Sequence, residues 1–150
     1  MIAVLQRVKH ASVTIDGALH SKIDNGLLVL LGVCDGDDKS DADKLVKKIP
    51  VLRTFEDDNG KMNLSCADIG GEILLVSQFT LCADCSHGRR PSFTKSAPPS
   101  QAEELYEYTA RMLKSTEVKD VKTGVFGADM KVELLNDGPV TIILDSKDLK

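Results

Sequence analysis

The stretch NDGPVT, Asn136 to Thr141, lies between two runs that have the pattern of β-strands, MKVELL (130–135) and VTIIL (140–144). Asp-Gly between two such runs is a strong signal for a β-hairpin. The next residue, Pro139, has no N–H for the strand ladder and a φ angle fixed near −65°. The sequence therefore predicts a hairpin whose first paired position cannot pair, which indicates that this turn serves another purpose.

Further strands are predicted upstream of this turn. Two runs, GLLVLLGV (26–33) and EILLVSQF (72–79), are apolar at nearly every position, which is typical of strands buried on both faces. Asn-Gly within DDNGK (57–61) predicts a second tight hairpin. Shorter strands are expected over 2–8, 11–15 and 18–23, and the chain is again β-rich over 118–145.

Two helices are expected between these strands. Over 38–52 the apolar residues follow the i, i+3, i+4, i+7 stripe of an amphipathic helix, and Pro50 should end or kink it. The second helix, about 101–114, is expected to begin with a capping box made by Ser100 and Glu103.

This order of elements predicts one α/β domain over residues 1–150. We expect mixed, largely antiparallel β-sheets, barrel-like or layered, with the two main helices packed on them. Tryptophan is absent and only four Phe and two Tyr are present, so the core should be aliphatic.

The formal net charge of −4 excludes a generally basic nucleic-acid-binding surface but allows a local basic patch. Arg7, Lys9 and His10 come too early for the apolar region of a signal peptide. The longest apolar run, 26–33, is far shorter than the roughly 20 residues that cross a membrane. A cytoplasmic protein without a membrane partner is therefore expected.

Four cysteines, Cys34, Cys66, Cys82 and Cys85, are expected to be thiols, because a disulfide framework is rare without secretion. Cys82-x-x-Cys85 followed by His87 leaves a zinc site or a redox pair as alternatives. A structural zinc usually needs a second such pair, and a redox pair needs a helix N-terminus after it. Two small loop residues are the favoured interpretation, with no metal.

SQFTL (77–81) lies where a buried strand runs into a long loop, a position at which sites are often built. Ser77 and Thr80 offer hydroxyl groups, and Gln78 offers an amide. A hydroxyl nucleophile needs a base, and no histidine lies in an arrangement that marks a catalytic triad. The alternative is that these side chains satisfy backbone groups at the strand end.

GRRPSFTK (88–95) gathers Arg89, Arg90 and Lys95 beside Phe93. This combination suits contact with phosphate next to a stacking surface, as in RNA binding. The alternative is a solvated basic loop.

Gly138-Pro139 has almost no side-chain bulk and two rigid carbonyl groups. The pair could accept hydrogen bonds from a ligand ammonium group while leaving no space beside the ligand's α-carbon. The alternative is a Gly-Pro corner in an edge strand, where cis prolyl bonds also occur.

Four segments together resemble the bacterial type of the D-aminoacyl-tRNA deacylase family: MIAVLQRVKHASVTIDG (1–17), SQFTL (77–81), GRRPSF (88–93) and FGADMKVELLNDGPVT (126–141). The resemblance covers nearly the whole chain. It implies a proofreading hydrolase in translation quality control that needs no cofactor. Such enzymes cleave the ester between a D-amino acid and the 3′-terminal adenosine of tRNA, and also act on glycine misattached to tRNA-Ala.

The resemblance also implies a homodimer with an active site at each end of the interface. Gly138 and Pro139 match a family motif whose cis peptide enters the partner's site, where it would collide with the side chain of an L-amino acid. Arg7 matches the arginine that holds this motif, and Met130 matches the methionine beside it.

The other pocket residues of the family map onto Ser77, Gln78, Phe79 and Ala97. Ser77 and Gln78 would place the ester carbonyl and the adenosine, and main-chain N–H groups near Phe79 would stabilise the oxyanion. Thr80 matches a threonine once favoured as nucleophile, whereas the family view assigns assistance to the ribose 2′-hydroxyl. Arg90 in the basic loop is expected to bind substrate.

The chain departs from the family pattern at Cys82 and Cys85, and at His87, where family members often carry lysine. A catalytically inactive tRNA-binding module of the same fold is the alternative function. A zinc or thiol protein built on Cys82-x-x-Cys85 is a third interpretation.

Overall fold

One long strand, β1 (Ile2–Ile15), organises the sheet in the computed structural model, which describes residues 1–150. One edge of β1 pairs with β3 (Gly26–Gly32) and then with β2 (Ala18–Ile23), and the other edge pairs with β8 (Lys131–Asp145). The sequence predicted two strands over 2–8 and 11–15. The strand is instead continuous, because shifts in its register with β8 absorb the bend between Val8 and Ala11.

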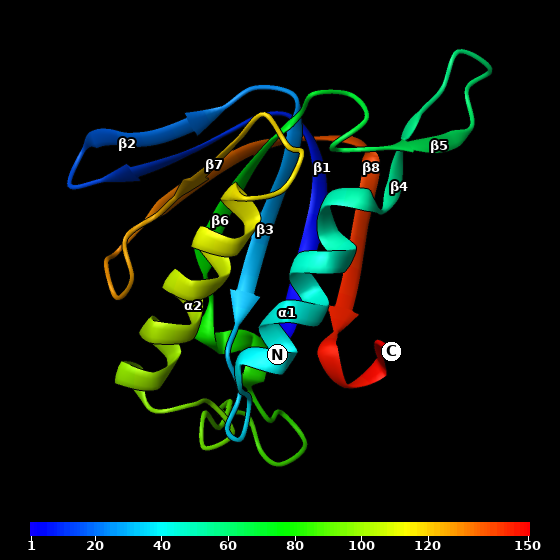
Figure 1. Ribbon diagram of the computed structural model, residues 1–150. Helices are drawn as coiled ribbons and strands as arrows, with labels where there is room; N and C mark the ends of the chain where they lie inside the picture. The colour runs from blue at the N-terminus through cyan, green and yellow to red at the C-terminus, as the bar shows by residue number, and fades with distance from the viewer.

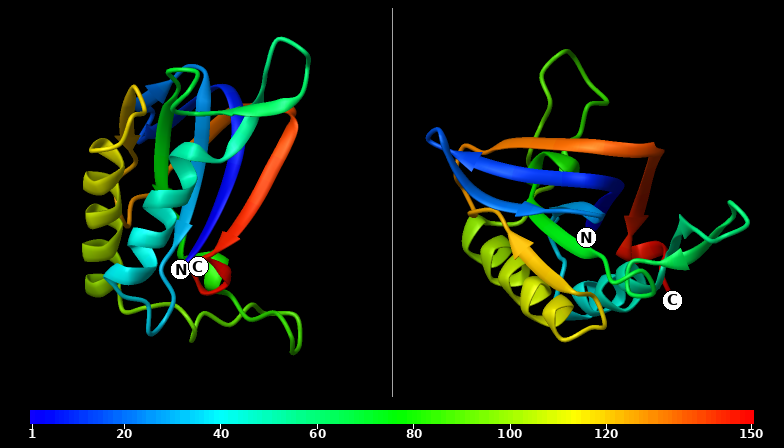
Figure 2. Two further views of the ribbon diagram at one scale, coloured as in Figure 1. Left: turned by 45° about the vertical axis from the view of Figure 1, so that its right-hand side comes forward. Right: turned by 90° about the horizontal axis from the view of Figure 1, so that it is seen from above.

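The parallel part of the sheet consists of β3, β6 (Glu72–Ser77) and β7 (Asp120–Thr123). The helices α1 (Lys39–Lys48) and α2 (Pro99–Lys114) lie in the connections between these strands and cover the same face of the sheet (Figure 1). The sheet curls so that β8 and the far half of β1 fold over its other face (Figure 2). The expected mixed α/β fold with a barrel-like sheet is confirmed.

The first helix begins and ends as predicted near Asp38 and Pro50, whereas the second begins differently. Asp38 caps α1 through a capping box with Asp41, and α1 ends at Lys48, before a 3₁₀ turn, η1 (Ile49–Val51), that contains Pro50. The predicted capping box of α2 is wrong, since α2 starts at Pro99 and has no side-chain cap. Proline at the first helical position presets φ, so the helix begins ahead of Ser100.

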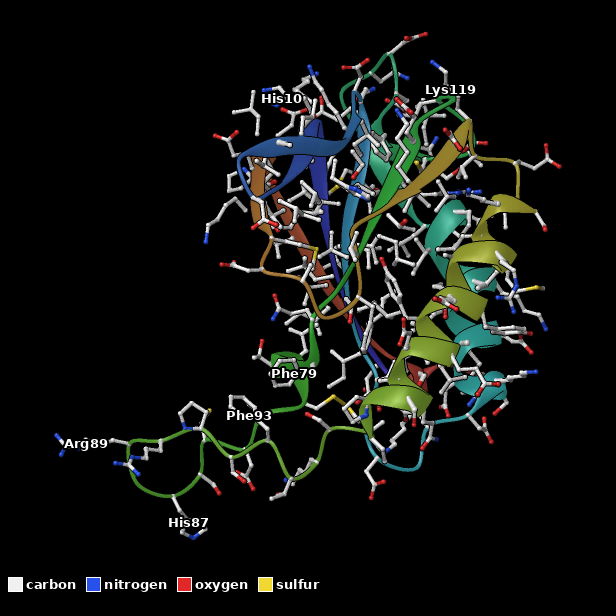
Figure 3. The ribbon with its side chains drawn as sticks, turned by 90° about the vertical axis from the view of Figure 1, so that its left-hand side faces the viewer. His10, Phe79, His87, Arg89, Phe93 and Lys119 are labelled. Carbon is white, nitrogen blue, oxygen red and sulfur yellow. A yellow bond between two sulfur atoms is a disulfide. The ribbon has the colours of Figure 1, made fainter.

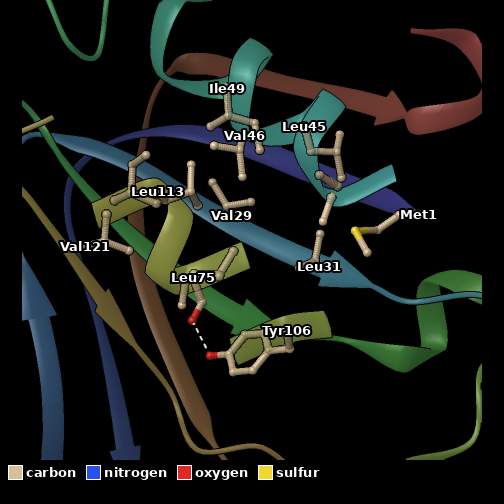
Figure 4. Close-up of a cluster of buried hydrophobic side chains, with 14 of the residues drawn as sticks. Met1, Val29, Leu31, Leu45, Val46, Ile49, Leu75, Tyr106, Leu113 and Val121 are labelled. Carbon is tan, nitrogen blue, oxygen red and sulfur yellow. Dashed lines mark hydrogen bonds between the residues drawn. The ribbon is translucent and has the colours of Figure 1, made fainter. Parts of the chain in front are cut away.

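Strands β3 and β6 are buried on both faces because they separate two apolar clusters. On the helix side, Leu27, Val29 and Leu31 alternate into a cluster of 23 buried residues that also holds the inner faces of α1 and α2 (Figure 4). On the other side, Leu28 joins Leu74 and residues from β1 in a cluster of seven. The Tyr106 hydroxyl crosses the larger cluster and donates to the Leu75 carbonyl at 2.7 Å.

NDGPVT is a corner within β8 and does not reverse the chain, so the predicted hairpin is wrong. Asn136 pairs with Val8 and Thr141 pairs with Gln6, so four residues of β8 (137–140) oppose the single residue Arg7 and protrude. We call residues 137–140 the β8 corner. The Asn136 side chain closes it, accepting from the Val140 N–H at 3.0 Å and donating to the Thr141 hydroxyl.

The other predicted hairpin is confirmed, with β4 (Arg53–Glu56) and β5 (Met62–Ser65) joined at the Asn-Gly turn as a separate small sheet. A last 3₁₀ turn, η3 (Ser146–Asp148), follows β8. None of the helices has the length and apolar character needed to cross a membrane.

Candidate active site

The SQFTL segment leaves the sheet at the end of β6 as a tight turn. The Gln78 N–H donates to the Leu31 carbonyl at 2.8 Å, and Phe79–Cys82 form the 3₁₀ turn η2. Gly32 makes this possible, because a Cβ there would lie 2.9 Å from the Leu81 Cβ and 3.0 Å from the Gln78 carbonyl oxygen. Glycine on β3 thus lets η2 pack directly against the neighbouring strand.

A cavity of about 770 Å³ lies beside η2, whereas four other hollows of the surface measure about 300 to 540 Å³. The cavity gathers residues from the end of β6, from the loop before α2 and from the segment before β8. Its walls include the predicted residues Ser77, Gln78, Phe79, Ala97 and Met130. A largely apolar cavity with a few polar groups is the usual form of a small-ligand site.

The cavity also contains residues that the sequence did not assign to it, above all Phe126 and Ala128, which precede β8. Phe93, noted only for its basic neighbours, forms an edge-to-face pair with Phe79, with ring centroids 5.2 Å apart (Figure 3). Both rings are about half exposed, so the cavity rim presents two aromatic surfaces on which a base could stack.

Thr80 does not line the cavity. Its hydroxyl accepts a hydrogen bond from the Gln78 side chain, and no histidine or carboxylate contacts it or the Ser77 hydroxyl. A general base must come within hydrogen-bond reach of the hydroxyl that it activates. The site therefore holds no assembled pair of side-chain nucleophile and base.

Main-chain donors are available instead. The first N–H groups of a helical turn have no partner inside that turn. The N–H groups of Phe79 and Thr80, which begin η2, take part in no turn, loop or side-chain hydrogen bond of the chain. The Phe79 carbonyl is fixed by the Ser96 hydroxyl, which donates to it at 3.3 Å.

A disulfide between Cys34 and Cys82 joins the end of β3 to η2, so the expectation of four thiols is wrong. Because β3 and β6 are parallel neighbours, their carboxyl ends meet at one edge and bring these cysteines together. Cys85 is an exposed thiol, and burial raises the pKa of the Cys66 thiol to about 12. No group of three or more His, Cys, Asp or Glu side chains is placed to hold a metal.

Arg7 lies against the β8 corner. Its side chain is buried, with Nε donating to the Asp137 carbonyl at 2.8 Å and Nη1 donating to the Thr54 carbonyl of β4 at 2.9 Å. The peptide between Gly138 and Pro139 is cis. Gly138 has a φ of 137°, and a Cβ there would lie 3.0 Å from Arg7 Nη2, so this position requires glycine.

Within one chain the corner and the cavity are separate. Gly138 and Pro139 are exposed and do not line the cavity, and Figure 1 shows the bend of β8 at the opposite end of the sheet from the end of β6. Arg7 pairs with Leu27, and Leu27 pairs with Ile73, four residues before Ser77. That offset corresponds to about 13 Å along the strand. Met130, which the resemblance places beside the Gly-Pro motif, lines the cavity of its own chain.

Comparison with known proteins identifies the family. The family model described as D-Tyr-tRNA(Tyr) deacylase matches residues 4–145. The chain belongs to this family. The D-aminoacyl-tRNA deacylase of Thermosipho africanus (strain TCF52B) is 58% identical over 147 residues, which are 98% of each chain. Deacylases are hydrolases, so the prediction of an enzyme of this class is confirmed.

Two solved structures support the same assignment of the fold. One, named c-Myc DNA Unwinding Element Binding Protein, is 44% identical, with a TM-score of 0.92 over 97% of this chain and 98% of its own. The other, described as a probable eukaryotic D-amino acid tRNA deacylase, has a TM-score of 0.78 over 96% of this chain and 98% of its own. At 14% identity, the second likeness concerns the fold alone.

Proposed function

We propose that this deacylase hydrolyses the ester between a D-amino acid and the 3′-terminal adenosine of tRNA, releasing the free amino acid and tRNA. The observation that carries the proposal is the cavity at the end of β6. It collects Ser77, Gln78, Phe79 and Ala97 in a chain whose relatives bear the deacylase name. Glycine attached to tRNA-Ala is a second substrate, and an enzyme that acts on tRNA is expected to work in the cytoplasm.

Catalysis rests on positioning. Ser77 and Gln78 orient the ester carbonyl and the terminal adenosine, whose base stacks at the Phe79–Phe93 rim. The unpaired main-chain N–H groups of Phe79 and Thr80 stabilise the oxyanion that forms when water attacks the carbonyl carbon. The ribose 2′-hydroxyl of the substrate assists that attack, which accounts for a site without an assembled side-chain base.

Chirality is read by the β8 corner of a partner subunit. In a homodimer, Gly138 and Pro139 of one chain enter the cavity of the other, and their carbonyl groups accept from the substrate ammonium. The side chain of an L-amino acid would collide with this backbone, whereas a D side chain points away and glycine has none. Two features support dimerisation: the outer edge of β8 is unpaired, and Leu135 and Ile143 are more than half exposed on it.

The decisive experiment compares hydrolysis of D-tyrosyl-, L-tyrosyl- and glycyl-tRNA by the same preparation. We expect fast release from the D and glycyl esters and little release from the L ester. Hydrolysis of the L ester as fast as the D ester would end the argument for chiral exclusion. If the D ester is hydrolysed fast and the glycyl ester slowly, only the proposal that glycyl-tRNA is a second substrate would be rejected.

A second candidate function is binding of nucleic acid without hydrolysis. It is favoured by the 44% identical structure, whose name describes a protein that binds DNA. This alternative predicts that the chain binds tRNA but leaves every aminoacyl ester intact at enzyme concentrations above those of the substrate. The same comparison of the three esters separates the two functions.

A further inference from the structure

A loop next to the cavity carries charge that no other part of the chain neutralises. Residues 85–91, here called the arginine loop, are all exposed and project from the body of the molecule, with His87 and Arg89 at the far end (Figure 3). The base of the loop is closed by two main-chain hydrogen bonds between Asp84 and Ser92, at 2.8 and 2.9 Å. The base of the projecting loop is therefore fixed to the body of the molecule.

The charges of the loop are divided between its base and its tip. At the base, Lys95 pairs with Asp84 at 3.2 Å. Hydrogen bonds from Ser86 and the charge of Lys95 lower the pKa of Asp84 to about 2. At the tip, Arg89 and Arg90 make no ion pair and no side-chain hydrogen bond in the chain. The base is neutral as a pair, and two guanidinium groups remain free.

The loop is continuous with the cavity rim. Three residues after Arg90, Phe93 lines the cavity and packs on Phe79, and Ser96 donates to the Phe79 carbonyl. Three residues span at most about 10 Å of chain. Successive phosphates of one duplex strand are spaced by about 3.4 Å along the helix axis. A polynucleotide whose last nucleoside lies in the cavity would thus bring its preceding phosphates within reach of the tip.

We propose that the arginine loop is a second binding surface, for the phosphate backbone of the tRNA acceptor arm, with Arg89 and Arg90 as the phosphate-contacting residues. This inference rests on the proposed function, because it takes the terminal adenosine to lie in the cavity. The charge distribution indicates that a polyanion binds at this loop. The chain carries a net charge of −4, yet two guanidinium groups beside the cavity have no acidic partner. Guanidinium groups bind phosphate oxygens in a bidentate manner.

Another group of lysines fits this partner less well. Lys22, Lys114 and Lys122 line a groove between β2 and β7 that shares no residue with the cavity. Lys122 is already engaged there, pairing with Glu72 at 3.6 Å and donating to the Lys22 carbonyl. The arginine loop is thus the basic surface that both adjoins the cavity and lacks internal partners.

The test uses the double variant Arg89→Ala/Arg90→Ala with two substrates, full-length D-aminoacyl-tRNA and the D-aminoacyl ester of adenosine. We expect KM for the tRNA to rise about tenfold with kcat unchanged, and the adenosine ester to be hydrolysed at the wild-type rate. The slope of log binding constant against log salt for uncharged tRNA should become shallower by about 1.5, because two phosphate contacts are lost. Arg89→Lys/Arg90→Lys should retain most of the affinity.

The matched control is Lys61→Ala/Lys119→Ala, which removes the same charge from two exposed positions. Lys119 lies at the opposite end of the molecule from Arg89 (Figure 3), and Lys61 lies in the turn between β4 and β5, which is also at that end (Figure 1). This control should leave the KM for tRNA and the salt slope unchanged. Equal losses on the tRNA and the adenosine ester, or an equal loss in the control, would overturn the proposal. The salt dependence of tRNA binding tests the role of the loop even if the protein cleaves neither ester. Failure to cleave either ester would reject the proposed function but not the role of the loop in binding.

Discussion

The cavity at the end of β6 and the β8 corner are built in opposite ways. The cavity is concave and braced on several sides, by Gly32, by the Ser96 hydroxyl and by the Cys34–Cys82 disulfide. The corner is convex and exposed, and a single buried side chain, Arg7, ties it to the rest of the molecule. One region has the form of a receptor and the other has the form of a ligand, which is the difference that the proposed docking of the corner into a partner's cavity requires.

Subunit complementation tests most directly whether the corner of one chain acts in the cavity of another. One chain carries Gln78→Ala in the cavity, and the other carries Gly138→Ala at the corner, where a Cβ would lie 2.8 Å from the Val140 side chain. Each homodimer should be inactive on D-tyrosyl-tRNA. Random mixing should restore about one quarter of wild-type specific activity, since half the dimers are mixed and each has one intact site. Activity that stays at background in mixed dimers would mean that corner and cavity act within one chain.

The disulfide tests how far the cavity depends on its bracing. It closes a segment of the chain with a sequence separation of 48. Its loss, by Cys34→Ser, should lower the free energy of unfolding by up to ~4 kcal/mol. Urea unfolding measures this, with Cys85→Ser as the control because Cys85 is an exposed free thiol. Equal unfolding midpoints for the two variants would show that the bridge does not brace η2.

Arg7→Ala tests the corner. The substitution leaves the Thr54 and Asp137 carbonyl groups without their donor, and hydrogen bonds from charged groups contribute about 1.5–3 kcal/mol each. We expect kcat/KM for D-tyrosyl-tRNA to fall about 100-fold, a loss of about 2.7 kcal/mol in transition-state stabilisation. Lys9→Ala serves as the control, because exposed Lys9 contacts the corner only through the Asp137 carboxylate at 3.4 Å. A loss as large in the control would point to a general change in charge.

Thr80→Ala should have the smallest effect. The Thr80 hydroxyl lies outside the cavity wall and is bonded to Gln78, so its removal should reduce single-turnover hydrolysis by about tenfold or less. A loss near 10⁴-fold, as expected for removal of a nucleophile, would contradict a mechanism based on main-chain donors and the substrate hydroxyl.

Local sequence patterns predicted the elements whose causes are local. The runs 26–33 and 72–79 carry apolar residues that face both sides of the sheet. In the structure, the residues on one side join the larger apolar cluster and those on the other side join the smaller one. The hairpin predicted at NDGPVT was wrong because the same turn residues occur in a hairpin and in a protruding corner of a strand. Only the register with β1, more than 120 residues away in sequence, distinguishes the two.

The residues of the site could be predicted only in part, because some of them are brought together by the pairing and folding of distant strands. Ser77, Gln78, Phe79 and Ala97 line one cavity, and their role in it remains a prediction. Phe126 and Ala128 join them only because β8 folds over the sheet, and the sole local signal was their position in a short connection before a strand. The Cys34–Cys82 bridge depends on the order of the strands, which cysteine spacing does not contain.

Gly32 has a consequence for how this enzyme could change. The residue contacts no substrate, yet the absence of a methyl group at that point determines where the Phe79 and Thr80 amides sit. An alanine there would push the turn outward by some tenths of an ångström, and displacements approaching 1 Å can reduce rates by about 100-fold. If these amides hold the oxyanion as proposed, the rate of hydrolysis depends on a residue of the adjacent strand that is not part of the cavity wall.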